Sequence, residues 1–169
     1  MSKKVLITGI TGQDGAYLSE LLVTKGYIVF GSLRKSKPIN DWRLKVLGVL
    51  NKINFVEFDY FSVTNIIKII EKIEPEMIFN LAAQSSVSTS FEQPIITSDI
   101  NGLSTLRILE AIKRTNKKIK FYQASSSEMF GKAISDLQDE NTPFFPKSPY
   151  GMSKLFAHWA NINYRETYD

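Results

Sequence analysis

The sequence predicts an α/β fold built on a doubly wound parallel sheet, in which helices cover both faces of the strands. Three observations support this prediction. Five short apolar runs alternate along the chain with amphipathic segments of helical period, as successive β-α units do. A turn with three regularly spaced glycines separates the first run from the first helical segment. The 169 residues, 43% of them hydrophobic, suffice for one domain with a sizeable core.

The composition argues against several classes of site and partner. The chain has no cysteine and a single histidine, His158, so we expect neither a disulfide framework nor a metal site. Its 21 Lys and Arg residues outnumber its 17 Asp and Glu residues, but they are scattered, and no basic stripe indicates nucleic acid as a partner. No apolar segment reaches the length of a membrane span and no signal peptide is recognisable, so we expect a cytoplasmic protein without a membrane partner.

The first strand is expected at residues 4–8 and the first helix at residues 16–25, with Leu18, Leu21 and Leu22 on one side and Gly26 at its end. Between them lies the turn Thr8-Gly9-Ile10-Thr11-Gly12-Gln13-Asp14-Gly15. A strand that passes through such a turn into a helix directs backbone N–H groups and the positive end of the helix dipole at one place, which suits a phosphate.

Each glycine of the turn has a separate expected role. Gly9 turns the chain, Gly12 lets a diphosphate approach the backbone, and Gly15 lets the helix pack closely on the strand. The spacing differs from the usual G-x-G-x-x-G of dinucleotide sites, and a glycine turn without a ligand is the alternative.

The second strand is expected at residues 27–33 and is followed by Arg34 and Lys35. Dinucleotide sites often place a carboxylate after this strand to bind the ribose 2′-hydroxyl, whereas a cation suits a 2′-phosphate. The sequence therefore favours NADP over NAD, with an ordinary basic loop as the alternative.

A short helix is expected at residues 41–47, with Asp41 as a plausible N-cap, and the third strand at residues 53–58. Asp59 follows this strand, where it could accept a hydrogen bond from an adenine amino group or cap the next helix. That helix, residues 63–73, carries a stripe of core residues: Ile66, Ile69, Ile70 and Ile73.

The fourth strand is expected at residues 77–83, and its small terminal residues leave room for a cofactor against the backbone. Residues 84–90 are expected to form a loop and residues 94–115 one helix. The apolar stripe of that helix is Leu103, Leu106, Ile108, Leu109 and Ile112. The fifth strand at residues 119–124 and a last helix at residues 150–168 complete the expected elements. A six-stranded nucleotide-binding fold requires another strand, so we expect this chain to be incomplete.

Tyr150 and Lys154 lie four residues apart on the last helix, so their side chains share one face. Ser148 is expected to cap this helix and Pro149 to occupy its first turn. A phenol with an ordinary pKa of about 10 is a poor base near neutrality. A neighbouring ammonium and the positive ring of an oxidised nicotinamide would favour the phenolate.

Two polar residues follow the fifth strand and strengthen this interpretation. Ser126 could hold a substrate hydroxyl against Tyr150, and Glu128 could serve as a second acid or base. A turn serine, a capping glutamate and a surface tyrosine are the alternatives for each residue alone. Their combination behind a dinucleotide loop favours a catalytic site.

Longer stretches of the sequence resemble the extended short-chain dehydrogenase/reductase family, and within it the GDP-mannose 4,6-dehydratases. The matching stretches are residues 7–15, 80–85, 121–131, 139–144, 148–151 and 163–166, so the resemblance covers essentially the whole chain. The Gly-Gln-Asp-Gly turn and the block Phe-Tyr-Gln-Ala-Ser-x-Ser-Glu are typical of the dehydratases. The glycine turn as such and Tyr-x-x-x-Lys belong to the wider family.

The resemblance implies an NADP-dependent lyase of nucleotide-sugar metabolism, on the route to GDP-fucose and related deoxyhexoses. Such an enzyme converts GDP-mannose into GDP-4-dehydro-6-deoxy-mannose and water, with transient oxidation at C4 and hydride return to C6. The implied catalytic residues are Tyr150 as the base for the 4-hydroxyl, Lys154 on the nicotinamide ribose, Ser126 in place of the usual threonine, and Glu128 as the acid/base at C5 and C6.

The resemblance also implies a cofactor site drawn from five segments. Gly9, Gly12 and Gly15 would hold the diphosphate, Arg34 and Lys35 the 2′-phosphate, and Asp59 the adenine. The full implied set is Gly9, Gly12, Gln13, Asp14, Gly15, Arg34, Lys35, Asp59, Tyr60, Leu81, Ala82, Ala83, Ser85, Tyr150 and Lys154.

Members of this family continue for a comparable length that completes the sheet and forms a sugar-nucleotide domain. The chain is therefore expected to be an N-terminal NADP-binding portion, residues 1–169, that is inactive alone and belongs to a dimer or tetramer when complete. Two alternatives stay open: another nucleotide-sugar 4,6-dehydratase, 4-epimerase or reductase, and a non-catalytic dinucleotide-binding module. Glu128 argues against simple epimerisation, because that reaction needs no acid/base at C5.

Overall fold

The computed structural model describes residues 3–34, 40–115 and 118–168, so Lys35 lies outside the described residues. The chain forms two compact units. The first comprises Met1–Ala82 and Glu110–Ala124, and the second comprises Ala83–Leu109 and Ser125–Asp169.

The first unit contains a five-stranded sheet in the order β3-β2-β1-β4-β5, and all four neighbouring pairs are parallel. The strands are β1 (Lys4–Thr8), β2 (Ile28–Leu33), β3 (Ile53–Glu57), β4 (Met77–Asn80) and β5 (Lys120–Gln123). The chain moves outward from β1 to β3 and then returns to β4 on the other side of β1. This order confirms the predicted doubly wound topology and puts its switch point at the carboxyl ends of β1 and β4, where ligands bind in such sheets.

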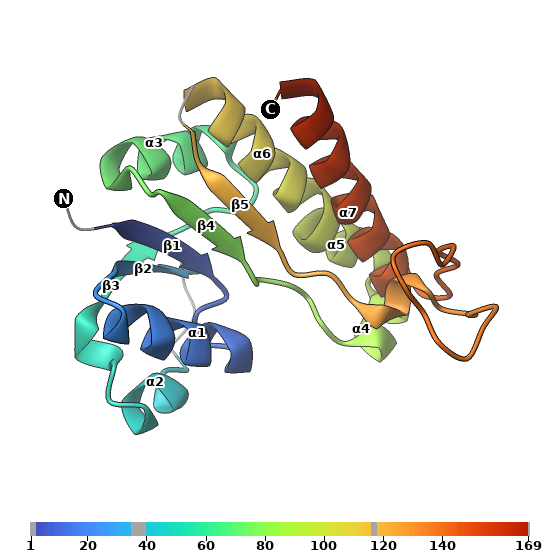
Figure 1. The fold of residues 1–169 in the computed structure, drawn as a ribbon, viewed down its shortest axis with the longest axis horizontal. Helices are drawn as coiled ribbons and strands as arrows, with labels where there is room; N and C mark the ends of the chain where they lie inside the picture. The colour runs from blue at the N-terminus through green and yellow to red at the C-terminus, as the bar shows by residue number, and fades with distance from the viewer. Residues whose placement is uncertain (1–2, 35–39, 116–117, 169) are drawn as a thin grey trace. The chain divides into compact units, whose positions relative to one another are not determined.

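Helices cover both faces of this sheet, with α1 (Gln13–Thr24) and α2 (Trp42–Val46) on one face and α3 (Val63–Ile73) on the other (Figure 1). A single 3₁₀ turn, η1 (Leu50–Lys52), precedes β3. The predicted bounds of α3 and its four buried isoleucines are confirmed. The core on the α1 side is the cluster Val5, Ile7, Ile10, Ala16, Leu22, Val29, Leu44, Val49 and Ile53.

Helix α1 differs from its prediction in its start and in its buried face. It begins three residues earlier than expected because Gly12 is the N-cap, and the turn residues Gln13 to Gly15 are already helical. Its buried residues are Gly15, Ala16, Ser19 and Leu22, whereas Leu21 is 51% exposed, so the prediction that Leu21 belongs to the core face is wrong.

The second unit is helical. It contains α4 (Val87–Glu92), α5 (Pro94–Ser98), a π-helical turn η2 (Asp99–Leu103), the start of α6 (Ser104–Thr115), a 3₁₀ turn η3 (Ser127–Met129) and α7 (Pro149–Tyr168). The expectation of a loop over residues 84–90 is wrong in its second half, because Ser86 caps α4 by accepting a hydrogen bond from the Thr89 N–H at 3.2 Å.

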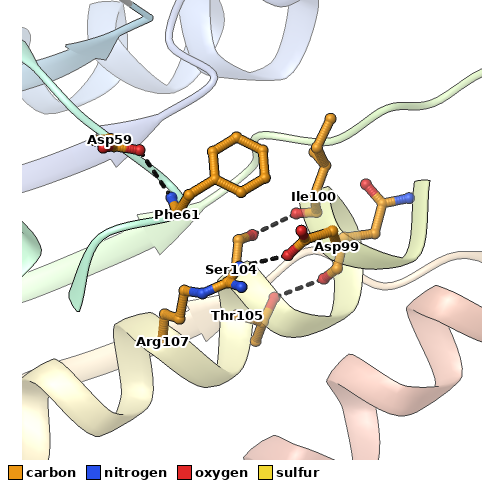
Figure 2. Close-up of polar contacts among 8 residues, drawn as sticks. Asp59, Phe61, Asp99, Ile100, Ser104, Thr105 and Arg107 are labelled. Carbon is orange, nitrogen blue, oxygen red and sulfur yellow. Dashed lines mark hydrogen bonds and ion pairs between the residues drawn. The ribbon is translucent and has the colours of Figure 1, made fainter. Parts of the chain in front are cut away.

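The single helix predicted over residues 94–115 is interrupted by the π turn. Two hydroxyls inside the helix donate hydrogen bonds to backbone carbonyls four residues earlier. Ser104 donates to the Ile100 carbonyl, and Thr105 donates to the Asn101 carbonyl at 2.9 Å (Figure 2). Such side-chain bonds compete with the regular helical ladder and accompany local changes of pitch. Arg107 and Asp99 span the same turn with an ion pair at 2.6 Å. Leu103, predicted to lie in the apolar stripe, is 42% exposed.

Among the described residues, no helix is both long enough and apolar enough to cross a lipid bilayer.

Candidate functional site

The glycine turn after β1 is held by close backbone contacts. Gly9 has φ +68°, and a Cβ there would lie 2.8 Å from the Ala82 backbone nitrogen. Gly15 approaches the turn itself, since a Cβ there would lie 2.5 Å from the Gly9 carbonyl oxygen and 2.7 Å from Ile10 Cα. Gly9 therefore reverses the chain against the end of β4. Gly15 packs the helix on the turn, which corrects the expectation that it packs on the strand.

Gly12 occupies the N-cap of α1 and is exposed. Its N–H donates to the Gly9 carbonyl at 2.9 Å, and its carbonyl accepts from the Ala16 N–H at 3.0 Å. A Cβ at this position would approach only the Gly9 oxygen, at 3.1 Å, so the outer side of the turn is open. The first N–H groups of a helix have no acceptor within that helix, and together with the dipole they suit an anion. Gln13 and Asp14 are exposed in this first turn.

The buried hydroxyl of Thr8 joins the turn to the end of β4, a role that the sequence did not suggest. It donates to Asn80 Oδ1 at 2.6 Å and accepts from the Leu81 and Ala82 N–H groups at 3.1 Å each. Asn80 Nδ2 in turn donates to Gln123 Oε1 at 2.7 Å. Thr8, Asn80 and Gln123 pair in register as the last residues of β1, β4 and β5. This polar row fixes Leu81 and Ala82, two predicted cofactor contacts, beside Gly9.

Tyr60 lies buried after β3, and its hydroxyl shares a 2.7 Å hydrogen bond with Ser32 Oγ of β2. Its ring packs against Phe58, with centroids 4.8 Å apart. Burial raises the pKa of the Tyr60 phenol, although hydrogen bonds with Ser32 and Thr8 and the charge of Arg34 act in the opposite direction. Arg34 itself is exposed directly after β2.

Asp59 is exposed, and its Oδ1 accepts a hydrogen bond from the Phe61 N–H at 2.9 Å (Figure 2). The N-cap of α3 is Ser62, whose Oγ accepts from the Asn65 N–H at 3.2 Å. The alternative in which Asp59 caps this helix is therefore wrong, and its contact with adenine stays a prediction.

The second unit brings the predicted acid/base residues together. Tyr150 and Lys154 are both buried on the first turns of α7, and Lys154 Nζ lies 5.9 Å from the centroid of the Tyr150 ring. Ser148 accepts a hydrogen bond from the Gly151 N–H at 3.0 Å, and Pro149 is the first helical residue, as expected. Burial lowers the pKa of the Lys154 ammonium.

The segment after β5 touches the same end of α7. Ser126 Oγ accepts a hydrogen bond from the Glu128 N–H at 3.2 Å, which leaves the hydroxyl proton for another acceptor. Glu128 is half-buried, and a Cβ on Gly151 would lie 2.5 Å from the Glu128 carbonyl oxygen. The residue that follows Tyr150 is thus in direct contact with the backbone of Glu128.

Asn101 is a further buried residue of this unit that the sequence did not single out. Its Nδ2 donates to Ser153 Oγ and to the Gln84 carbonyl, both at 3.0 Å, and its Oδ1 accepts from the Gln84 N–H at 2.9 Å. Ser153 donates in turn to the Tyr150 carbonyl at 2.7 Å. Asn101 therefore ties the segment that carries Ala83 and Ser85 to α7 beside Lys154. An isolated asparagine within a helical pattern gives no sequence signal for this role.

The described residues contain no group of three or more His, Cys, Asp or Glu side chains that could hold a metal ion. His158 packs edge-on against the rings of Phe144, at 5.1 Å, and Trp159, at 5.5 Å.

Comparison with known proteins supplies the family context of these two sites. A family model described as GDP-mannose 4,6 dehydratase matches residues 6–169. The chain is 46% identical to a GDP-mannose 4,6-dehydratase of Vibrio cholerae serotype O1 over 178 residues, covering 99% of this chain and 47% of that protein. It is 44% identical to the human GDP-mannose 4,6 dehydratase, covering 97% of this chain and 46% of that protein. The chain thus spans about half the length of the curated relatives it matches.

A solved structure with the same fold is the UDP-glucuronic acid 4-epimerase of Bacillus cereus in complex with UDP-glucuronic acid and NAD. It is 27% identical with a TM-score of 0.82, and the match covers 98% of this chain and 53% of that chain.

Proposed function

The chain belongs to the GDP-mannose 4,6-dehydratase family, and on this premise we propose that the complete protein converts GDP-mannose into GDP-4-dehydro-6-deoxy-mannose and water. The observation that carries the proposal is the contact between Gly151 and the Glu128 backbone, which joins the Glu128 loop to the first turn of the helix that bears Tyr150. Loss of water from C5 and C6 needs an acid/base in addition to the base that acts on the 4-hydroxyl. A 4-epimerase needs only the latter.

We infer a nicotinamide dinucleotide as the cofactor. The open turn around Gly12, the helix N-terminus behind it and the close packing at Gly9 and Gly15 support a bound diphosphate. The structural relative from Bacillus cereus was solved with NAD. When bound, the cofactor takes up the hydride from C4 of the sugar and gives it back at C6.

Within this class we propose NADP as the form used. Arg34 follows β2 directly, at the place where a carboxylate would favour NAD. Lys35, which lies outside the described residues, is the second proposed contact to the 2′-phosphate. Asp59, Tyr60, Leu81, Ala82, Ala83 and Ser85 complete the proposed lining of the cofactor site.

The acid/base residues would then act in order. Tyr150 takes the proton of the 4-hydroxyl, and the ammonium of Lys154 stabilises the phenolate and binds the nicotinamide ribose. Ser126 donates its hydroxyl proton to a sugar oxygen. Glu128 removes the C5 proton as the C6–O bond breaks, and it returns that proton to the departing hydroxide, which leaves as water. As C6 regains the hydride, C5 takes a proton from solvent, and Tyr150 releases to solvent the proton that it took from the 4-hydroxyl.

Incubation of the complete protein with GDP-mannose and NADP tests the proposal, with the product identified by mass and NMR. We expect a 4-keto-6-deoxy sugar nucleotide. A Glu128→Gln variant should oxidise C4 without losing water, whereas a Tyr150→Phe variant should do neither. Turnover of a different nucleotide sugar, or formation of a 4-epimer without loss of water, would replace the proposed substrate or reaction.

A second candidate function, a non-catalytic dinucleotide-binding module, makes the opposite prediction for Tyr150. Under that function a Tyr150→Phe variant would retain the full cellular function of the protein. The buried Tyr150–Lys154 pair favours catalysis, because a binding module has no need of an ammonium near a phenol.

We further propose that residues 1–169 are the NADP-binding portion and have no turnover of GDP-mannose alone. An assembly of two or four copies and a cytoplasmic location stay predictions, which sedimentation of the complete protein and cell fractionation would test.

A further inference from the structure

A buried glycine in the first turn of α7, Gly151, lies against the backbone of the Glu128 loop. A Cβ on Gly151 would lie 2.5 Å from the Glu128 carbonyl oxygen, 3.2 Å from the Glu128 carbonyl carbon and 3.1 Å from Pro146 Cβ. The nearest of these atoms belongs to the main chain, so no rotation of a side chain relieves the overlap. The two segments are as close as they are because residue 151 has no side chain.

Hydrogen bonds hold the backbone on both sides of this contact. The Gly151 N–H donates to Ser148 Oγ at 3.0 Å. On the other side, the Glu128 N–H donates to Ser126 Oγ at 3.2 Å, and the Met129 carbonyl accepts from the Phe145 N–H at 3.1 Å. A methyl group at residue 151 would therefore displace the Glu128 peptide or the start of α7 as a whole.

We propose that Gly151 is a positioning residue that sets the distance between the carboxylate of Glu128 and the phenol of Tyr150. The proposal rests on the function proposed above, in which Tyr150 acts at the C4 oxygen and Glu128 at the adjacent carbon C5. These two groups must reach substituents on neighbouring carbon atoms of one sugar, so their separation has to match the substrate. Tyr150 and Lys154 share one helix and keep their mutual geometry when the contact changes.

The overlap that alanine would create gives the size of the expected effect. The 2.5 Å approach is close to 1 Å inside the 3.4 Å at which ordinary van der Waals contact begins. A misplacement of about 1 Å costs about 100-fold in rate when a reacting group must be held in a near-attack geometry. The rate at which Glu128 removes the C5 proton should fall by this factor, and the rate of C4 oxidation with Tyr150 as the base should change much less.

The test uses a Gly151→Ala variant of the complete protein. Gly102→Ala is the matched control, because it also adds a methyl to a buried helical glycine of the same unit. There the nearest atom to the new Cβ would belong to a side chain and not to the backbone, the Phe156 ring at 3.0 Å, and Phe156 is 46% exposed. Rapid mixing with GDP-mannose and NADP measures C4 oxidation as reduced nicotinamide. Exchange of the C5 hydrogen in D₂O and product formation measure elimination, and thermal melting reports on the fold.

We expect Gly151→Ala to lower C5 exchange and product formation about 100-fold while C4 oxidation and KM stay within a few-fold of the parent. Gly102→Ala should leave both steps within a few-fold. Equal loss of both steps in Gly151→Ala, or loss of neither, would overturn the positioning role. A parent protein that does not eliminate water from GDP-mannose would overturn the proposed function instead.

A Glu128→Asp variant keeps the test decisive should Gly151→Ala fail to fold. It withdraws the carboxylate by one methylene and leaves the Gly151 contact intact. We expect selective loss of elimination here as well. Elimination at the parental rate would show that the separation is not critical, which would refute the proposal.

Discussion

Replacing Thr8 by valine tests whether one hydroxyl fixes the backbone of Leu81 and Ala82 at the proposed cofactor site. Valine has nearly the same shape as threonine, so the substitution removes the hydroxyl and little else. The Thr8 side chain is fully buried, and its hydroxyl makes hydrogen bonds to Asn80 Oδ1, the Leu81 N–H, the Ala82 N–H and Tyr60. All of them would be lost together.

The expected loss of stability follows from these bonds. Each hydrogen bond contributes about 1 kcal/mol net, and a buried partner left unsatisfied costs about 1–3 kcal/mol. Water can reach the partly buried amides of Leu81 and Ala82 and replace part of what they lose. We therefore expect Thr8→Val to lower the free energy of unfolding by about 2–3 kcal/mol. In a domain of this size that corresponds to a fall in Tm of roughly 4–12 °C.

Denaturant titration and differential scanning calorimetry measure this loss, and dinucleotide titration measures its effect on binding. Thr8→Ser is the control, because it keeps the hydroxyl and removes one buried methyl, at a cost of about 1 kcal/mol. Binding should weaken in the valine variant and survive in the serine variant. If the two variants lose the same stability and the same affinity, packing of the methyl rather than the hydroxyl holds the end of β4, and our reasoning is wrong.

Two further predictions concern the cation after β2 and the cap of α7. Arg34→Ala in the complete protein should weaken the binding of NADP by about tenfold, or about 1.4 kcal/mol, and leave the binding of NAD nearly unchanged, as measured by competition. Equal weakening of both cofactors would exclude a contact between Arg34 and the 2′-phosphate. Ser148→Ala should lower the free energy of unfolding by about 1 kcal/mol, because the Gly151 N–H loses its acceptor. Ser135→Ala, in an exposed loop, is the control and should change the free energy of unfolding by no more than about 0.5 kcal/mol. Comparable losses of stability in both variants would argue against the cap.

The topology and most elements were predictable because their signals are local. The apolar runs predicted the strands, and the isoleucine spacing predicted both bounds of α3. The interruption at Asp99–Leu103 was not predictable from apolar periodicity, because it depends on hydroxyls of Ser104 and Thr105 that turn inward to the backbone. The exposure of Leu21 shows the same limit. Periodicity gives the apolar face of α1, but the packing of the rest of the unit decides which part of that face is buried, and Leu21 is left exposed.

The candidate site likewise has one part that local spacing predicts and another part that it does not. Tyr150 and Lys154 lie one turn apart on a single helix, so their shared face follows from spacing alone. The contacts that place other groups join residues far apart in the chain, as between Thr8 and Asn80 or between Gly151 and Glu128. A single sequence carries no pattern for such pairs, because a threonine at a strand end and a glycine in a helix each have many possible neighbours.

Tyr60 provides a titration whose sign follows from its surroundings. Burial is the largest influence on this phenol and raises its pKa above the ordinary value of 10.0. The folded state therefore holds the proton more tightly than the unfolded state does. It follows that Tyr60 adds stability that is fully present below about pH 10 and is lost as the pH rises through the raised pKa.

The difference in phenolate absorbance between the parent protein and a Tyr60→Phe variant isolates this one group among the seven tyrosines. We expect less than half of the Tyr60 side chains to be ionised at pH 10.0 in the folded protein, whereas about half of the tyrosine side chains should be ionised at that pH in the denatured chain. Ser32→Ala removes a hydrogen bond that lowers this pKa, so it should move the titration to still higher pH. A titration midpoint of Tyr60 below pH 10 with the fold intact would show that Arg34 and the hydrogen bonds outweigh burial, and that the phenol is not held in the apolar setting beside Phe58.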